Sequence, residues 1–370
     1  MFGNLLVITP RFVGCLIAAA AVAWVAVTVV YRRRRHWSVL TLAVVLALSL
    51  TAASGGDAVN AHYQFLPRVD DVIGVPTWPQ TSLSNATSPA PAAPHQNRYP
   101  AGTVVAVPLA GPVSGFGSPH ALVYLPPQYF TQPQQRFPVV YLLHGSPGAP
   151  VDWFRAARAA QAGLTVARAG SPVILVAPRV SRRWTDDSEC VDRPSERIET
   201  YVTRDVVPDV DRLFRTNPDR AGRAVAGMSA GGFCALNIGL RNRQLFSTII
   251  DMSGYDQPTH DGGMRALYQQ PDTATGRRQA QIDAAADTPS DYLPRLPRQP
   301  LMRVWLDSGR DDLLPRQQLT YVDQTLTAHS QQAILTIRPG GHDYGVWRPA
   351  LAAALTWAAP AMTPTPTTPG

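Results

Sequence analysis

The sequence predicts an α/β protein in which a mostly parallel, eight-stranded sheet is flanked by helices and preceded by an N-terminal transmembrane helical hairpin. Short β-branched runs alternate with helical patterns between residues 98 and 359, and several of these runs are apolar on both faces. Two longer apolar stretches precede them. With 370 residues, 45% hydrophobic and 16% charged, the chain is too long for one small module and too apolar for bulk disorder.

The two apolar stretches, Phe12–Tyr31 and Trp37–Ala53, are each long enough to cross most of a bilayer. Between them lies the run Arg32–Arg35. A secretory signal carries its basic residues before its apolar stretch, whereas here they follow it, which places the arginine loop in the cytoplasm. We therefore expect a multi-pass protein of the cell membrane whose main domain is extracytoplasmic. The alternative is that only one stretch spans the membrane.

These features divide the chain into four parts. Residues 1–55 are expected to form the two transmembrane helices, and residues 56–97 a linker rich in Pro, Ala and Ser. The main domain is expected over residues 98–359. Residues 360–370, in which Pro and Thr alternate, are expected to be a disordered tail.

Eight strands are expected in the main domain, the first two antiparallel and peripheral. They lie near residues Thr103–Val107, Ala121–Leu125, Val139–Leu143, Val173–Val176, Arg223–Ala226, Thr248–Ile250, Met302–Leu306 and Ile334–Ile337.

Helices are expected between these strands. One runs from Asp152 as its N-cap through Ala169, one from Pro194 toward Phe214, and one begins at Ala230. The polar, proline-bearing segment Gly254–Arg298 predicts an excursion above the carboxyl edge of the sheet, where ligand sites of such sheets lie.

The charged residues exclude several classes of function. The sequence has no lysine, so all 33 basic residues are arginine, which excludes a lysine Schiff base, a P-loop lysine and a Ser-x-x-Lys base. The net charge of +7 comes from scattered arginines, so no nucleic-acid partner is expected. Two interpretations stay open for an acidic loop, a cation site or a solvated surface; the second is favoured, and we assign no metal. The loop contains Asp186, Asp187, Glu189 and Asp192.

Three cysteines are present. Cys15 lies in the first apolar stretch, which leaves Cys190 and Cys234 for a disulfide in an exported domain. Cys234 could equally be a small core residue, so both interpretations stay open.

The strongest motif is GMSAGG at Gly227–Gly232, which matches Gly-x-Ser-x-Gly between a strand and a helix. Such a turn holds a serine hydroxyl exposed at the edge of a sheet, and it requires small neighbours because the backbone is strained. Ser229 is therefore the predicted nucleophile.

A serine nucleophile needs a base, and His342 in PGGHDYGVW follows the last strand in the expected chain order. A carboxylate should orient that imidazole. Asp312 in LDSGRDD is favoured, while Asp311, Asp307 and Asp251 remain alternatives.

An acyl-transfer site also needs donors for an oxyanion. We expect the backbone N–H groups of Ala230 and of Ser146, the latter in the glycine-rich turn LLHGSPG. His144 in that turn is expected to brace it rather than to act as the base. Trp153 and Trp184 follow strand ends and are candidates for contacts with substrate.

The motifs YLLHGSPG, DWF, ETYV, GMSAGG, SGRDD and GGHDYGVW resemble the esterase D and feruloyl-esterase branch of the α/β-hydrolase superfamily, to which the mycolyltransferases are related. The resemblance covers roughly residues 102–357. It implies the α/β-hydrolase fold and a serine hydrolase that forms an acyl-enzyme, without metal or organic cofactor. The sequence has His-Gly in the oxyanion turn where mycolyltransferases carry Asp-Gly, which favours an esterase.

The sequence therefore predicts a membrane-anchored extracytoplasmic serine esterase acting on a small-molecule or lipid ester. One alternative is a cell-envelope acyltransferase that passes the acyl group to a sugar or lipid hydroxyl. The other is a non-catalytic, membrane-tethered binding protein. The sequence does not indicate an oligomeric state.

Overall fold

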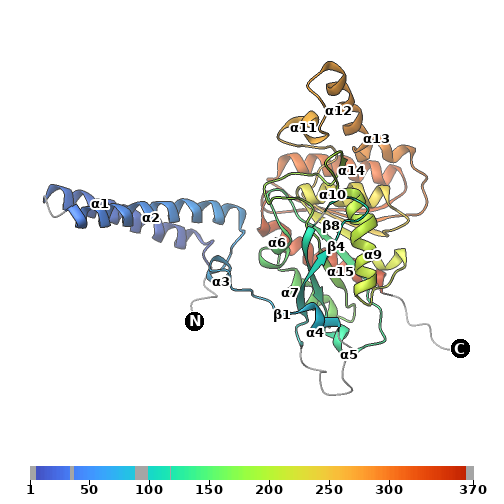
Figure 1. Cartoon of the computed structure of the whole chain (residues 1–370), viewed down its shortest axis with the longest axis horizontal. Helices are drawn as coiled ribbons and strands as arrows, with labels where there is room; N and C mark the ends of the chain where they lie inside the picture. Colours follow the sequence, from blue (N-terminus) through green and yellow to red (C-terminus); the bar gives the residue numbers. More distant parts are fainter. Residues whose placement is uncertain (1–5, 34–36, 88–98, 117, 364–370) are drawn as a thin grey trace. The chain divides into compact units, whose positions relative to one another are not determined.

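The computed structural model describes residues 6–33, 37–87, 99–116 and 118–363 (Figure 1). The chain divides into two compact units, one made of Met1–Thr77 with Asp343–Gly345, the other of Trp78–His342 with Val346–Gly370. Part of the arginine loop, the linker segment 88–98 and the tail 364–370 lie outside the described residues, so the predictions made for them are not tested.

Two long apolar helices dominate the N-terminal unit, α1 (Pro10–Arg32) and α2 (Trp37–Tyr63). Their most apolar 18-residue windows have mean hydropathies of 2.5 and 1.9, so both are long and apolar enough to cross a membrane. Thr9 caps α1 by accepting a hydrogen bond from the Phe12 N–H. Helix α2 continues past the predicted end at residue 53, and a short α3 (Val69–Val72) follows.

The second unit is built on a nine-stranded sheet with the order β1-β2-β3-β5-β4-β8-β9-β10-β11. Strand β3 pairs antiparallel with β2 and β5, and all other neighbours are parallel. All eight predicted strands are present, and the first two are antiparallel as expected. The ninth is the two-residue edge strand β1, in the predicted linker. The bounds are β1 (Gln80–Thr81), β2 (Thr103–Leu109), β3 (Ser118–Leu125), β4 (Val139–Leu143), β5 (Ile174–Ala177), β8 (Arg223–Met228), β9 (Thr248–Met252), β10 (Arg303–Gly309) and β11 (Gln332–Arg338).

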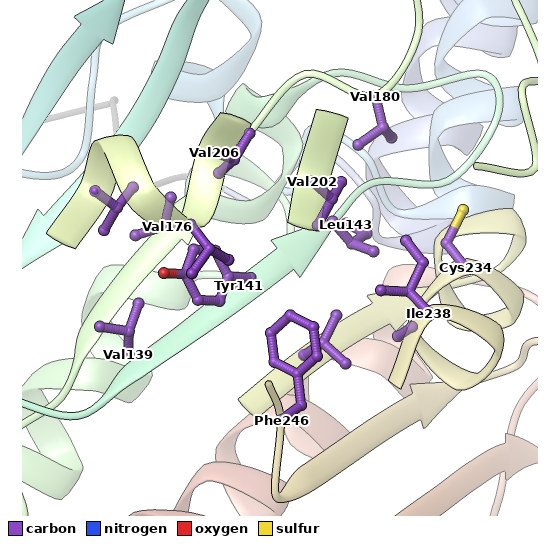
Figure 2. Packing of buried hydrophobic residues seen from close by; sticks show 14 of the residues in the cluster. Val139, Tyr141, Leu143, Val176, Val180, Val202, Val206, Cys234, Ile238 and Phe246 are labelled. Carbon is purple, nitrogen blue, oxygen red and sulfur yellow. The ribbon is translucent and has the colours of Figure 1, made fainter. Parts of the chain in front are cut away.

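One face of the sheet is covered by α9 (Val207–Leu213), α10 (Ala230–Arg241) and α14 (Leu313–Ala328), which share one buried apolar cluster with it. Val139, Tyr141 and Leu143 point from β4 into this cluster because alternate residues of a strand share a face. Figure 2 shows these side chains beside Ile238 of α10 and Phe246. The cluster supports the strand that ends at the nucleophile motif.

The opposite face carries α6 (Pro150–Arg155), α7 (Ala159–Arg168) and α15 (Tyr344–Met362). The prediction of one helix from Asp152 to Ala169 was wrong, because Arg158 adopts a left-handed conformation with φ 58° and interrupts it. Asp152 lies in the first turn of α6, where its carboxylate accepts the Ala149 N–H at 2.7 Å.

The helical run predicted from Pro194 begins at α8 (Ile198–Thr200) and continues through a π-helical turn, Tyr201–Val206, into α9. A short antiparallel pair precedes it, β6 (Asp192–Arg193) and β7 (Glu196–Arg197). The predicted excursion contains three helices that project at one end of the unit (Figure 1). These are α11 (Gly263–Leu267), α12 (Ala274–Ala286) and α13 (Pro289–Tyr292), and two further short helices elsewhere are α4 (Leu83–Thr87) and α5 (Pro127–Thr131).

Candidate active site

Ser229 stands in a sharp turn between β8 and α10, with φ 57° and ψ −129°. A non-glycine residue adopts such a backbone only where the surroundings enforce it. The Ser229 N–H donates to the Met252 carbonyl at 2.9 Å. A Cβ on Gly231 would lie 2.1 Å from the Leu143 carbonyl oxygen, and one on Gly227 would lie 1.7 Å from that of Gly231. The glycines of the motif are therefore required by close backbone approach.

Three predicted residues meet at this turn. The Ser229 Oγ lies 2.8 Å from His342 Nε2, and the His342 Nδ1 lies 2.9 Å from Asp312 Oδ2. In the neutral tautomer that fits both contacts, Nδ1–H donates to Asp312 and Nε2 accepts the Ser229 hydroxyl proton. The edge of the Trp347 ring system also contacts the imidazole, with centroids 4.8 Å apart. Residues from three different loops thus form one hydrogen-bonded chain.

The alternative carboxylates have other surroundings. Asp311 is exposed, and its N–H donates to the Gly340 carbonyl. Asp307 is fully buried and accepts two hydrogen bonds from Arg338 Nε, at 2.8 and 3.0 Å. Burial raises the pKa of Asp307 to about 6 despite that arginine. Asp251 is buried beneath the turn, where it accepts the Gly254 N–H and burial raises its pKa. Asp312 is the one of the four that reaches His342.

His144 supports the loop that follows β4. Its Nε2 accepts the Val180 N–H at 3.1 Å, so the proton resides on Nδ1 and is donated to the Gly145 carbonyl at 2.9 Å. Burial lowers the pKa of His144 to about 4, which keeps the imidazole neutral. Through these two hydrogen bonds His144 braces the loop after β4, as the sequence predicted.

The predicted oxyanion donors lie on either side of the nucleophile. A Cβ on Gly145 would contact the Ser229 Cβ at 3.1 Å, so the loop that carries Ser146 packs directly on the turn. Ala230 is the first residue of α10, where backbone N–H groups lack intrahelical acceptors. Within the described part of the chain, neither the Ser146 nor the Ala230 N–H donates a hydrogen bond. Both donors are available to a ligand.

A cavity of about 940 Å³ opens beside this centre. Its walls come from two segments, residues 182–196 and 255–269, together with the Ser146 loop and Leu314. Most of the lining side chains are polar or charged: Arg182, Arg183, Thr185, Asp186, Asp187, Arg193, Ser195, Glu196, Tyr255, Thr259, His260, Asp261 and Gln269. The cavity is suited to a hydrophilic part of a substrate.

Tyr255 is the residue of this site that the sequence analysis missed. Its hydroxyl lies 3.4 Å from the Ser229 Oγ, and burial raises its pKa to about 12, so the phenol is neutral. The signal was its place in SGYD, directly after β9, because residues after parallel strands gather at the same edge as the nucleophile.

Trp153 and Trp184, both predicted to contact substrate, lie in different surroundings. Trp153 is fully buried in α6, so the prediction that it contacts substrate was wrong. A large aromatic side chain on a helix that packs against the sheet is more stable in the core than in a loop. Trp184 is 63% exposed and lies between Arg183 and Thr185, two residues of the cavity wall. Its carbonyl accepts the Gly148 N–H at 2.7 Å.

Cys190 and Cys234 form a disulfide, which resolves the alternative left open by the sequence. It ties the 182–196 wall to α10, five residues after the nucleophile. In the acidic loop, Asp186 pairs with Arg183 and Asp192 accepts from Thr200. No group of three or more His, Cys, Asp or Glu side chains is arranged to hold a metal ion among the described residues.

A family model and several related proteins match this chain. The family model described as "Esterase: Putative esterase" matches residues 117–358. The chain is 27% identical to an uncharacterized protein of Corynebacterium glutamicum over 352 residues, covering 90% of this chain and 78% of that protein. It is 32% identical over 148 residues to an esterase of Mycobacterium tuberculosis, covering 40% of this chain and 31% of that protein.

A solved ferulic acid esterase has a similar fold. It superposes with a TM-score of 0.59 at 22% identity, over 70% of this chain and 98% of that structure. The α/β-hydrolase fold predicted from the sequence is therefore confirmed.

Proposed function

The chain belongs to the esterase family, and we propose that it is a serine hydrolase that cleaves carboxylic esters through an acyl-enzyme formed on Ser229. The observation that carries this proposal is the hydrogen-bonded chain from the Ser229 Oγ through His342 to Asp312, with contacts of 2.8 and 2.9 Å. A serine hydroxyl is a weak nucleophile unless a base removes its proton, and this chain supplies the base and its orienting carboxylate.

The first half of the reaction forms the acyl-enzyme. As the Ser229 Oγ attacks the ester carbonyl carbon, its proton passes to His342 Nε2, and Asp312 stabilises the resulting imidazolium. The backbone N–H groups of Ser146 and Ala230 donate hydrogen bonds to the carbonyl oxygen and stabilise the negative charge that develops on it. When the intermediate collapses, the alcohol leaves with the proton from His342.

The second half releases the acid. Water enters in place of the alcohol, His342 takes its proton, and the oxygen attacks the acyl carbon. Collapse of this second intermediate breaks the bond to the Ser229 Oγ, which recovers its proton from His342. Every group then returns to its starting protonation state.

Covalent labelling tests the nucleophile. We expect a fluorophosphonate probe to label the purified protein and Ser229→Ala to abolish the labelling, because the probe reacts only with an activated serine. Ser195→Ala is the matched control, since this serine lines the cavity and its hydroxyl accepts a hydrogen bond from Gln269, and it should label like the wild type. An unlabelled wild type, or a labelled Ser229→Ala, would contradict the assignment and favour the non-catalytic alternative.

A second candidate is transfer of the acyl group to a hydroxyl other than water. The polar cavity of about 940 Å³ favours it, because it has room for an acceptor beside the Ser229 turn. Mass spectrometry of protein given p-nitrophenyl esters of increasing chain length, with and without trehalose or glycerol, distinguishes the two. An acyl-trehalose or acyl-glycerol product supports transfer, whereas free acid alone supports hydrolysis.

We propose further that α1 and α2 anchor the enzyme in the cell membrane as a two-span hairpin. Their large apolar side chains are exposed, for example Val22 at 69% and Leu42 at 70%, which is unfavourable in water and favourable in lipid. The disulfide of the second unit agrees with an oxidising, extracytoplasmic location. Protease added to intact cells should digest the second unit but leave the hairpin; complete protection until lysis would contradict this orientation.

A further inference from the structure

Glu189 is a buried acid that the mechanism above does not use. It is only 1% exposed and adopts a left-handed backbone with φ 42°. Its neighbour Cys190 is fixed to α10 by the disulfide. Its Oε1 accepts two hydrogen bonds from Thr259, from the N–H at 2.7 Å and from the hydroxyl at 3.1 Å. Within the described residues, the buried Oε2 has no hydrogen-bond partner.

Glu189 lines a small void that Ala230, the residue directly after Ser229, also lines. Gly145, Ser146, Ala230 and Glu189 all line it, and its free space of about 10 Å³ matches a single oxygen atom or water molecule. Thr259, which holds the Oε1, does not line this void, whereas Glu189 does. The void therefore lies between Glu189 and the two residues whose backbone N–H groups are the predicted oxyanion donors.

The surroundings of the Glu189 carboxyl determine its protonation state. Burial, with the charge of Asp187 and more weakly that of Asp287, raises the pKa of Glu189 to about 8, although the Thr259 donors oppose the shift. Of the other titratable groups that interact with it or share its void, His144, Tyr255 and Tyr268 are neutral. Asp186, which also lines the void, forms an ion pair with Arg183. Near neutral pH the group is a carboxylic acid and can donate a hydrogen bond.

We propose that Glu189 is the third donor of the oxyanion hole, its Oε2 hydroxyl donating to the substrate carbonyl oxygen beside the backbone N–H groups of Ser146 and Ala230. The proton stays on Glu189 throughout, and the hydrogen bond strengthens as the carbonyl oxygen becomes negative in the transition state. This inference rests on the proposed esterase function. It makes Glu189 a catalytic residue rather than a structural one.

The proposal has a consequence for pH dependence. When Glu189 loses its proton, the donor becomes an anion that faces the developing oxyanion and repels it. The rate should therefore fall as the pH rises through about 8, the pKa of Glu189. The lost proton, and not a change in fold, is the cause of that alkaline limb.

The test compares kcat and KM for p-nitrophenyl acetate between about pH 5.5 and 9.5 in wild type, Glu189→Gln and Glu189→Ala. We expect Glu189→Ala to lose about 10- to 100-fold in kcat, since one oxyanion donor is removed. Glu189→Gln keeps an N–H donor that does not titrate, so it should stay within about 10-fold of wild type and lack the alkaline limb.

Glu199→Gln is the matched control, because Glu199 is another largely buried glutamate but binds Arg241 and Asn242 away from the void. It should keep the wild-type pH profile. Coincident profiles of wild type and Glu189→Gln, or a folded Glu189→Ala with kcat within about threefold of wild type, would overturn the proposal. If Glu189→Ala does not fold, the pH profile of kcat for Glu189→Gln is the deciding measurement. A wild type without ester turnover would instead refute the esterase function.

Discussion

The reactive centre and the walls of the cavity are held in place in different ways. The centre consists of turns that directly follow β8, β10 and β11, and backbone contacts fix it, such as Ser229 N–H to Met252 and Asp311 N–H to Gly340. The walls, residues 182–196 and 255–269, are held by side chains. Glu196 pairs with both Arg182 and Arg193, and a disulfide joins one wall to α10. The sheet edge thus positions Ser229, Asp312 and His342, while the walls add side chains such as Glu189 and Tyr255 around them.

The largest difference in kcat is expected between two alanine variants, one at a histidine of the reactive centre and one at a histidine of the cavity wall. His342→Ala should lower kcat by about 10⁴-fold or more, because Ser229 loses its base. His260→Ala removes a side chain of the wall and should leave kcat within about fivefold. Steady-state ester hydrolysis by the two variants measures the difference. A similar loss of kcat in both would mean that the two regions do not act separately.

Removing the disulfide tests how the wall is attached. Cys190 and Cys234 are 44 residues apart, and the double serine variant should lose about 3 to 4 kcal/mol of unfolding free energy, because the unfolded chain is no longer cross-linked. The wall should loosen, so KM should rise more than kcat falls. Cys15→Ser, at an exposed position of α1, is the control and should match the wild type. Denaturant titration of the purified variants gives the free energies.

A buried ion pair beneath the centre is the next test. Arg338→Met leaves the fully buried Asp307 without its cation, at an expected cost of about 2 to 3 kcal/mol in unfolding free energy. Burial raises the pKa of Asp307 from 3.8 to about 6, so its ionisation destabilises the folded state as pH rises through this range. Arg338 opposes that effect. The loss on substitution should therefore be greater near pH 8 than near pH 4.5, and a pH-independent loss would argue against it.

The smallest expected effect is at a contact between the two walls. Gln269 binds the Ser195 N–H at 3.1 Å and also the Ser195 hydroxyl, on the exposed side of the cavity. Gln269→Ala should change KM by up to about fivefold and leave kcat within about twofold, since an exposed hydrogen bond contributes about 1 kcal/mol. A larger fall in kcat than rise in KM would show that the walls position the reactive centre.

Local sequence patterns were sufficient to predict most of the fold and to pick out the three residues that form the hydrogen-bonded chain. The alternation of apolar runs with helices located eight strands, and GMSAGG, SGRDD and GGHDYGVW each stood at a strand end. The α6–α7 break at Arg158 was missed because a left-handed arginine has no sequence signal. Trp153 was misplaced because an aromatic residue after a strand can face the core or a cleft with equal local propensity.

The sequence by itself determined which residues can react and in what order along the chain, because strained turns and buried strands need particular residue types at short spacing. Only the tertiary structure decided which of four aspartates reaches His342, that Cys190 pairs with Cys234, that Tyr255 reaches Ser229, and that Glu189 lines a void with Ala230. Those contacts join segments from different strand ends. Their distances depend on how the sheet orders its strands, which no local pattern encodes.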